Sequence, residues 1–393
     1  MLGCGVAALQ GITDTALCAL VSGLAPGAAR KLLADVHRGR SPRPRPGLSA
    51  AAIAAVAARA HLPAMQVAVE RASVVDPFTK LVLQTADDLR IETVRIPLDR
   101  PGRVSVCVSS QAGCALACAF CATGRLGLAR NLEAWEIVEQ VRAVRAGLAA
   151  GERVHGVVFQ GMGEPMANLD RVLAAIEVMT APYALAIDAR AITVSTAGLP
   201  EGIRRLARAA PRVRLGLSLG SARPEVRRQL MPIAAAHPLD DVIEATTEHA
   251  QVTGLAPMWA VTLLDGINDG DDDAAALAEL AGRFRQRTGL APRLSVIAYN
   301  RIDADDRDPF RPSSPERTAA FRDTLAAAGI RTHRRYSGGS DIAAACGQLA
   351  AHVDENDAYR SLPIERSVAI GGVRVGLDQV TPSPRVTSEP GTS

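Results

Sequence analysis

The sequence predicts an α/β protein: a partial (βα)6 barrel with a small, mainly helical N-terminal domain. From residue 104 onward, six short apolar runs rich in Val, Ile and Leu alternate with six longer segments of helical periodicity. Strand–helix alternation indicates parallel strands, because each helix returns the chain to the start of the next strand. An open doubly wound sheet is the alternative, and in both arrangements function belongs at the carboxyl ends of the strands.

The repeat defines each expected element. The expected strands are 104–109, 154–160, 191–195, 214–219, 258–264 and 294–299. The expected helices are 133–149, 168–180, 200–209, 239–253, 271–288 and 315–328. Helical spacing gives the first helix one apolar face: Trp135, Val138, Val141, Val144 and Leu148. Asn131 is its predicted N-terminal cap.

The flanking regions differ from the repeat. The N-terminal part is Ala-rich and predicted to be helical, with a Pro/Arg linker at 40–46. Apolar runs at 80–86 and 91–97 flank Asp87-Asp88 and predict a β-hairpin. The polar, Pro- and Ser-rich end after about residue 376 is expected to be disordered. The predicted divisions, in order, are 1–75 (helical domain), 76–103 (hairpin extension), 104–352 (catalytic barrel) and 353–393 (C-terminal extension).

Composition limits the class of protein. Hydrophobic residues make up 48% of the 393 residues, so a large core can be buried, and the low aromatic content of 3% makes that core aliphatic. No apolar run is long enough to cross a bilayer, and the apolar start lacks a basic leader, so we expect a cytoplasmic protein without membrane association. The net charge of +3 and the Arg clusters at 204–208 and 331–335 are weak indications of an anionic partner.

Three of the chain's seven cysteines lie close together: Cys114, Cys118 and Cys121. An odd number of cysteines and no secretory signal argue against a disulfide scaffold. The C-x3-C-x2-C spacing lets one loop hold three corners of a [4Fe–4S] cubane, and no fourth cysteine or histidine lies in the loop to close the cluster or a zinc site. One iron would then be free to bind S-adenosylmethionine (SAM). The alternative is three small buried hydrophobic side chains.

Five motifs together resemble the RlmN/Cfr family of radical SAM RNA methyltransferases, in the family's order and over residues 80 to 350. They are Cys107–Cys121, Gly161–Pro165, Ser195–Gly198, Asp265–Asp269 and Asp341–Leu349. The resemblance implies methylation of an adenine ring carbon, C2 or C8, which is too electron-poor to attack a SAM methyl group. The chemistry therefore belongs to the cofactors.

The resemblance also implies roles for two further cysteines. Cys346 matches the cysteine that carries the methyl group, and Cys107 matches the one that releases the product through a transient disulfide. The strand pattern places Cys107 on the face opposite valines 104, 106 and 108. Taken singly, Cys107 could be an ordinary barrel-wall residue and Cys346 a packed helix residue.

By the same resemblance, Glu92 matches the proton acceptor, although its spacing to Cys107 is slightly longer than the family's. A solvent-facing strand glutamate is the alternative. Strand ends predict Gly163 and Glu164 in the SAM pocket, and the resemblance implies that Ser195, Ser218, Leu219, Gly220 and Asn300 complete it. Gly163 would allow close approach of the cofactor, and Glu164 would accept from its ammonium group, unless the turn only joins strand to helix.

This chain departs from the family at two places. Gly220 stands where the family has histidine, so a side-chain contact to SAM is either absent or replaced by water. The N-terminal region is Ala-rich and hard to align. The favoured function is methylation of adenine C2 in rRNA, and also in tRNA, with an electron donor such as flavodoxin or ferredoxin. Alternatives are C8 or another RNA, a radical SAM enzyme of another type, and a non-catalytic RNA-binding relative.

Overall fold

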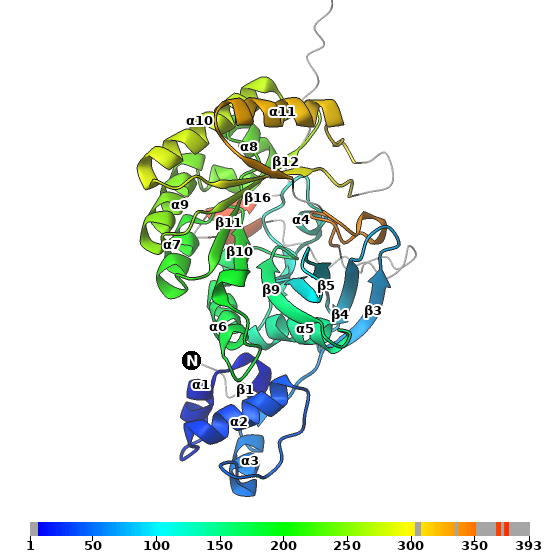
Figure 1. The fold of residues 1–393 in the computed structure, drawn as a ribbon, viewed down its shortest axis with the longest axis vertical. Helices are drawn as coiled ribbons and strands as arrows, with labels where there is room; N and C mark the ends of the chain where they lie inside the picture. The colour runs from blue at the N-terminus through cyan, green and yellow to red at the C-terminus, as the bar shows by residue number, and fades with distance from the viewer. Residues whose placement is uncertain (1–6, 303–307, 335–336, 351–366, 371–372, 377–393) are drawn as a thin grey trace, which may run out of the picture.

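One ten-stranded sheet forms the body of the protein (Figure 1). The computed structural model describes residues 7–302, 308–334, 337–350, 367–370 and 373–376. The spatial order of the strands is β14 (Thr332–Arg334), β13 (Arg293–Ala298), β12 (Met258–Leu263), β11 (Arg214–Ser218), β10 (Ile192–Thr196), β9 (Arg153–Phe159), β6 (Arg103–Cys107), β5 (Arg90–Pro97), β4 (Thr79–Gln84) and β3 (Gln66–Ala72).

Within this sheet, β6 and the strands from β9 to β14 run parallel and follow chain order, which confirms the predicted α/β fold class. A doubly wound sheet would reverse its strand order at a switch point, so the unbroken order identifies the partial barrel. The predicted hairpin is present as β4 and β5, which pair antiparallel and join the barrel through β6. The short β14 was not predicted, because its sequence, Thr-His-Arg, carries no apolar signal.

Helices follow the parallel strands and cover the outside of the sheet (Figure 1). The six predicted helices are present as α5 (Ala134–Ala146), α6 (Leu169–Thr180), α7 (Pro200–Ala209), α9 (Leu239–Thr253), α10 (Asp271–Thr288) and α11 (Pro315–Ala327). Short elements that were not predicted are α4 (Ala122–Leu126), α8 (Pro224–Leu230), η2 (Pro165–Asn168), η3 (Ala189–Ala191), η4 (Pro232–Ala235) and η5 (Ser340–Ile342).

Helix α5 packs its predicted apolar face into the core of the barrel. Ile137, Val138, Val141 and Val144 are buried in the main core, and each such side chain contributes about 1.5–3 kcal/mol by burial. Trp135, predicted on this face, is half-buried at its edge. The predicted cap at Asn131 is wrong. The N-cap residue is Glu133, whose backbone N–H donates to the Glu136 carboxylate at 2.8 Å.

The reason for that error is a hairpin that the sequence pattern does not reveal. Asn131 ends strand β8 (Gly127–Asn131), which pairs antiparallel with β7 (Gln111–Cys114). The hairpin therefore takes up Asn131, and the helix begins only at Ala134, after the N-cap residue Glu133.

The N-terminal helices form a separate lobe at one end of the molecule (Figure 1). Its elements are β1 (Ala7–Ala8), η1 (Leu9–Gly11), α1 (Asp14–Leu20), α2 (Pro26–His37), α3 (Ala50–Ala57) and β2 (Ala60–His61). They enclose their own apolar cluster, which includes Leu17, Leu32 and Leu33. Polar contacts join it to the barrel. The Tyr183 hydroxyl donates to Asp14 Oδ1 at 3.0 Å and accepts from the Asp14 N–H at 2.8 Å, and Arg142 donates to the Val36 carbonyl at 2.5 Å.

The prediction that this region stays helical to residue 75 is wrong. Gln66–Ala72 forms the edge strand β3, which pairs with β4. Tertiary pairing overrides the helical composition here.

At the other end, the chain forms an antiparallel pair, β15 (Ser367–Ile370) and β16 (Val373–Gly376). The predicted disordered tail lies outside the described residues. No helix in the described part of the chain is both long and apolar enough to cross a bilayer.

Candidate functional site

The three clustered cysteines lie in a loop after β6 that is stiffened at both ends. Cys114 is the last residue of β7 and pairs with Gly127 of β8, and Cys121 is the N-cap residue of α4. Gly124 of α4 crosses so close to the loop that a Cβ there would lie 2.9 Å from the Cys118 backbone nitrogen. Hairpin and helix therefore hold the cysteine loop (residues 114–121) in one shape.

The thiols of this loop are strongly influenced by one another. Burial raises the pKa of Cys114 to about 12 and also raises the pKa values of Cys118 and Cys121. The charges of Cys114 and Cys121 raise the pKa of Cys118 further. Cysteine binds a metal as the thiolate, not as the thiol. With pKa values this high, the three thiols need a positively charged centre to ionise at neutral pH. An iron–sulfur cluster meets that need.

A single metal ion fits less well than a cluster. Among the residues that the structure describes, no three or more His, Cys, Asp or Glu side chains are arranged around one point. A tetrahedral zinc ion needs its ligands around one point, whereas cubane ligands bind separate corners. The donor set therefore favours the predicted cluster over zinc.

Cys346 lies on a segment, residues 343–350, that packs directly against the cysteine loop. The Ala122 N–H donates to the Gly347 carbonyl at 2.7 Å, and the Thr123 hydroxyl donates to the Leu349 carbonyl at 2.5 Å. Gly347 has φ +87°, and a Cβ there would approach the Phe120 carbonyl to 3.2 Å. The charge of Cys346 also contributes to raising the pKa of Cys121. The fold thus brings the predicted methyl carrier beside the predicted cluster ligands.

The backbone at Cys346 is held by two polar side chains. The Cys346 N–H donates to Ser337 Oγ at 2.9 Å, and Asn300 Nδ2 donates to the Cys346 carbonyl and to Ser337 Oγ, both at 3.1 Å. Asn300 was predicted as a SAM contact. In the structure its amide orients the cysteine segment, a role that sequence spacing does not suggest.

Cys107 and Cys346 line the same cavity, which has a volume of about 80 Å³. Cys107 ends β6 and pairs with Val94 of β5, and the Thr93 hydroxyl donates to its carbonyl at 2.7 Å. Neither cysteine forms a disulfide in the structure. Other residues lining the cavity are Phe78, Ile96, Gln160, Ser337 and Leu349. Two cysteines far apart in sequence thus line one cavity, and their roles stay a prediction.

Glu92 is fully buried on β5 and does not line that cavity. Its Oε1 lies 2.9 Å from Lys80 Nζ of β4, without the alignment of a hydrogen bond, and its Oε2 accepts from the Ala350 N–H at 3.0 Å. Lys80 also donates to the Ala343 carbonyl at 3.2 Å. The Lys80–Glu92 pair thus holds both ends of segment 343–350. The alternative of a solvent-facing glutamate is excluded by this burial, and the role of proton acceptor stays a prediction.

The predicted SAM residues share the carboxyl edge of the parallel strands. Ser195 lies near the end of β10, and Ser218 is the last residue of β11. Ser195 Oγ is buried and has no hydrogen-bond partner among the described residues, as expected of a hydroxyl that meets a polar ligand. Gly216 makes room for this hydroxyl, since a Cβ there would approach it to 2.4 Å.

Gly163 and Glu164 form a tight turn after β9. Gly163 has φ +97°, and a Cβ there would lie 2.5 Å from Gln111 Cβ, so the packing of β7 requires this glycine. The Glu164 carboxylate accepts from the backbone N–H groups of Met166 at 2.9 Å and Ala197 at 2.8 Å. Burial raises the pKa of Glu164. The turn therefore links the ends of β9 and β10 to strand β7, which leads into the cysteine loop.

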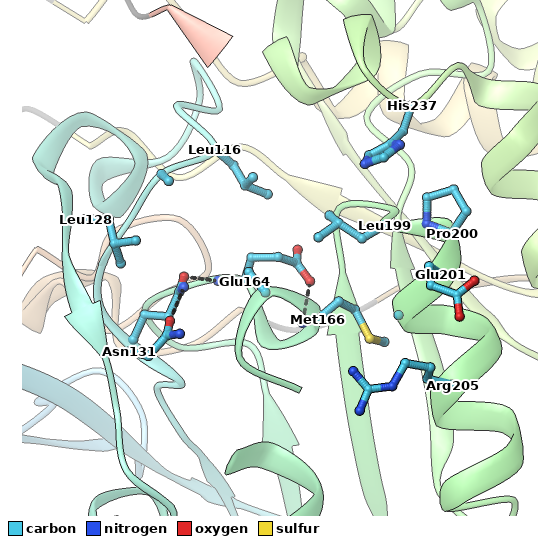
Figure 2. A pocket seen from close by; sticks show the side chains of 14 residues that line it. Leu116, Leu128, Asn131, Glu164, Met166, Leu199, Pro200, Glu201, Arg205 and His237 are labelled. Atoms are coloured by element: carbon cyan, nitrogen blue, oxygen red, sulfur yellow. Dashed lines mark hydrogen bonds between the residues drawn. The ribbon is translucent and has the colours of Figure 1, made fainter. Parts of the chain in front are cut away.

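Glu164 also lines the larger cavity of about 420 Å³ (Figure 2). Leu116 and Leu128, from the side of the cysteine loop, face Leu199 and His237 across it, with Glu164 between them. This volume is in the range of small-molecule sites.

Gly220 stands where the family has histidine, and the structure shows which atoms lie beside it. Gly220 has φ +71°, and a Cβ there would lie 2.6 Å from Met231 Sδ and 4.0 Å from an Arg227 nitrogen. The Met231 side chain therefore lies where a Cβ of residue 220 would be, so protein atoms take part of the space that a histidine would need at this position.

The basic clusters noted in the sequence are largely neutralised. Arg204 pairs with Glu248 at 2.7 Å, Arg205 with Asp170 at 2.5 Å and Arg208 with Glu201 at 3.4 Å. The cluster at 331–335 lies partly outside the described residues. These arginines give no evidence for a phosphate-binding surface.

Four residues of the site were missed from the sequence: Lys80, Ser337, Arg227 and Met231. Lys80 offered a signal, because it is one of only two lysines in an Arg-rich chain and stands inside an apolar strand. Ser337 and Met231 offered none, because the sequence pattern around them does not show that Ser337 bonds to Cys346 or that Met231 lies against Gly220.

Comparison with known proteins agrees with the geometry. The model of the radical SAM superfamily matches residues 108–281. A probable RNA methyltransferase of Sorangium cellulosum is 55% identical over 343 residues, 82% of this chain and 87% of that protein. The dual-specificity RNA methyltransferase RlmN of Syntrophobacter fumaroxidans is 43% identical, over 70% of this chain and 77% of that protein. A solved radical SAM methyltransferase from Sphaerobacter thermophilus is 34% identical with a TM-score of 0.77, over 88% of this chain and 100% of that chain.

Proposed function

The chain belongs to the RlmN-type radical SAM RNA methyltransferases, and we propose that it methylates adenine C2 in rRNA, and also in tRNA. Its cofactors are a [4Fe–4S] cluster and SAM. The supporting observation is the cavity that Cys107 and Cys346 share beside the cysteine loop. When bound, the cluster and SAM supply the electron and the radical that methylation of an electron-poor carbon requires.

In this proposal Cys114, Cys118 and Cys121 hold the cluster, and Cys346 carries the methyl group as a thioether. The thiol of Cys346 would lose a proton when its sulfur bonds to a methyl carbon supplied by SAM; the bond between that carbon and the SAM sulfur would break, and its electron pair would stay on the SAM sulfur. Ser337 and Asn300 fix the backbone on either side of that sulfur, so the methyl group is presented in one direction.

Cys107 releases the product. Once the carried carbon has bonded to adenine, the Cys107 thiolate attacks the Cys346 sulfur and forms a disulfide. The sulfur–carbon bond breaks, and its electron pair stays with the carbon, which takes up a proton. A thiol reductant must return two electrons to the disulfide before the next turnover. The shared cavity is where the two sulfurs would meet.

Glu92 is proposed as the group that accepts the adenine ring proton. Its carboxylate is held between Lys80 Nζ at 2.9 Å and the Ala350 N–H at 3.0 Å. To reach the substrate, one oxygen must leave the Ala350 N–H. Segment 343–350 would therefore have to shift when RNA binds.

The proposal implies two partners. One is an RNA whose adenine can be turned out of its stack into the site. The other is a one-electron donor such as flavodoxin or ferredoxin. The enzyme would work in the cytoplasm, where both kinds of RNA are found.

The test is nucleoside mass spectrometry of rRNA and tRNA from cells with and without the gene. The expected result is 2-methyladenosine that depends on the gene. Gene-dependent 8-methyladenosine would show that the methylated carbon is C8 and not C2, with the roles of Cys107 and Cys346 unchanged. No change in any methyladenosine, with the protein expressed and its cluster intact, would contradict the proposal.

A further inference from the structure

Arg227 is a buried charge without a carboxylate partner. Its side chain, on α8, is 0% exposed. Its guanidinium donates to three carbonyls, those of Ala197 at 2.5 Å, Ser218 at 3.3 Å and Leu219. No ion pair to Asp or Glu exists for it within the described part of the chain, and its Nε has no hydrogen-bond partner there.

An isolated charge in this position is costly. Burying an unpaired ion costs several kcal/mol, and carbonyl dipoles offset only part of that. Burial lowers the pKa of Arg227 to about 10, so the group still carries its charge at neutral pH. A neutral side chain could tie the strand ends together at less cost. The charge itself therefore calls for an explanation.

One glycine, Gly198, gives this guanidinium space, and a second, Gly220, lies beside it at van der Waals distance. A Cβ at Gly198, after β10, would lie 3.1 Å from one Arg227 nitrogen, and a Cβ at Gly220, after β11, would lie 4.0 Å from another. The family's histidine is absent at position 220. The arginine thus occupies the carboxyl edge of the sheet, where the cofactors bind.

The cysteine loop docks on the same helix. The Ala119 N–H, between Cys118 and Cys121, donates to the carbonyl of Leu230 at 3.0 Å. Leu230 is the last residue of α8, one turn beyond Arg227. In agreement with this closeness, the Arg227 charge lowers the pKa of Cys118, although burial remains the dominant influence and raises it.

We propose that Arg227 is a positioning residue for the cluster, whose buried positive charge offsets the negative charge of the thiolate-bound cluster and raises its reduction potential. This inference rests on Cys114, Cys118 and Cys121 being the cluster ligands. Three thiolates around a 2+ cluster core leave one net negative charge, and reduction adds another. A nearby cation stabilises the reduced form more than the oxidised form, so a one-electron donor can reduce it more easily.

The test compares reduction potentials of the reconstituted full-length protein by dithionite titration under electron paramagnetic resonance. Arg227→Gln keeps donors for the carbonyls but removes the charge, and Arg227→Lys keeps the charge. Arg228→Gln, an exposed neighbour on the same helix, is the control. We expect Arg227→Gln to lower the one-electron reduction constant at least tenfold, 59 mV, while the lysine and control variants stay near the wild type.

Equal potentials in the wild type and Arg227→Gln would overturn the inference. If Arg227→Gln fails to hold iron, full iron in Arg227→Lys supports a role of the charge; loss of iron in both folded variants would overturn it, because a purely structural role predicts that result. A wild-type protein that binds no cluster at these three cysteines would instead refute the ligand assignment in the proposed function.

Discussion

The two cysteine-bearing segments of the site are held in opposite ways. The cysteine loop is fixed by its sequence neighbours, the β7–β8 hairpin and α4. Segment 343–350 is fixed by residues far away in the chain, Lys80, Glu92 and Asn300. The proposed cluster site is thus built locally, whereas the cysteine proposed to carry the methyl group is placed by residues from across the barrel. The two segments should respond differently to substitution.

Cys118→Ala should have the largest effect. Two thiolates cannot replace the three-point attachment of the cluster, so iron should be lost and RNA methylation should fall to the level without enzyme. Iron analysis and a methylation assay measure both. Cys18→Ala, in the N-terminal lobe, is the matched control and should keep full iron. Full iron in Cys118→Ala would contradict the assignment of the cysteine loop as the cluster site.

Lys80→Met should have the largest effect on folding. It leaves the Glu92 carboxylate buried without its cation, which costs about 3–5 kcal/mol in the free energy of unfolding. The exposed Lys31→Met is the matched control and should change stability by less than about 0.5 kcal/mol. Chemical denaturation measures both variants.

The double variant Lys80→Met/Glu92→Leu should regain most of the lost stability, because it removes the unpaired charge. If the single and double variants are equally unstable, the pair does not hold segment 343–350 through its charges.

The cysteine loop should make the cluster-free protein sensitive to alkaline pH. Burial raises the pKa of Cys114 from 9.0 to about 12, so its contribution to stability is complete below pH 9 and is lost as the pH rises toward 12. The expected slope from this thiol is about 1.4 kcal/mol per pH unit. Chemical denaturation of the cluster-free protein and of cluster-free Cys114→Ala at pH 8 to 10 measures this contribution as the difference between the two slopes. Identical slopes would show that the thiol is not buried.

Ser337→Ala should have the smallest effect. It removes the acceptor of the Cys346 N–H and of Asn300 Nδ2, and should lower the free energy of unfolding by about 1–2 kcal/mol. The exposed Ser340→Ala in the same region is the control. We also expect slower methylation of Cys346 with unchanged iron content. Unchanged stability and methylation would mean that other contacts suffice to orient the segment.

The same contrast explains what could be predicted from the sequence. The barrel was predictable because strand and helix periodicities are local. The cysteine loop was predictable because its three cysteines lie within one short stretch of sequence. Asn131 was misjudged because the β7–β8 hairpin depends on pairing across the loop. Gln66–Ala72 was misjudged because an exposed edge strand has no clear apolar alternation.

Contacts between separate segments could not be predicted from periodicity and spacing. Nothing near Ser337 or Lys80 in the sequence shows that both touch the Cys346 segment. The resemblance to a family supplied Cys107 and Cys346, but only the fold showed that they share one cavity and that Gly220 is filled by Met231 and Arg227.

The most direct test of the two-segment site is peptide mass spectrometry of the protein purified from cells, wild type and Cys107→Ala. We predict a methyl group on Cys346 in the wild type and RNA covalently bound to Cys346 in Cys107→Ala, with full iron in both. A methyl-free Cys346 in active enzyme, or normal turnover by Cys107→Ala without an adduct, would contradict the assignment of these two cysteines.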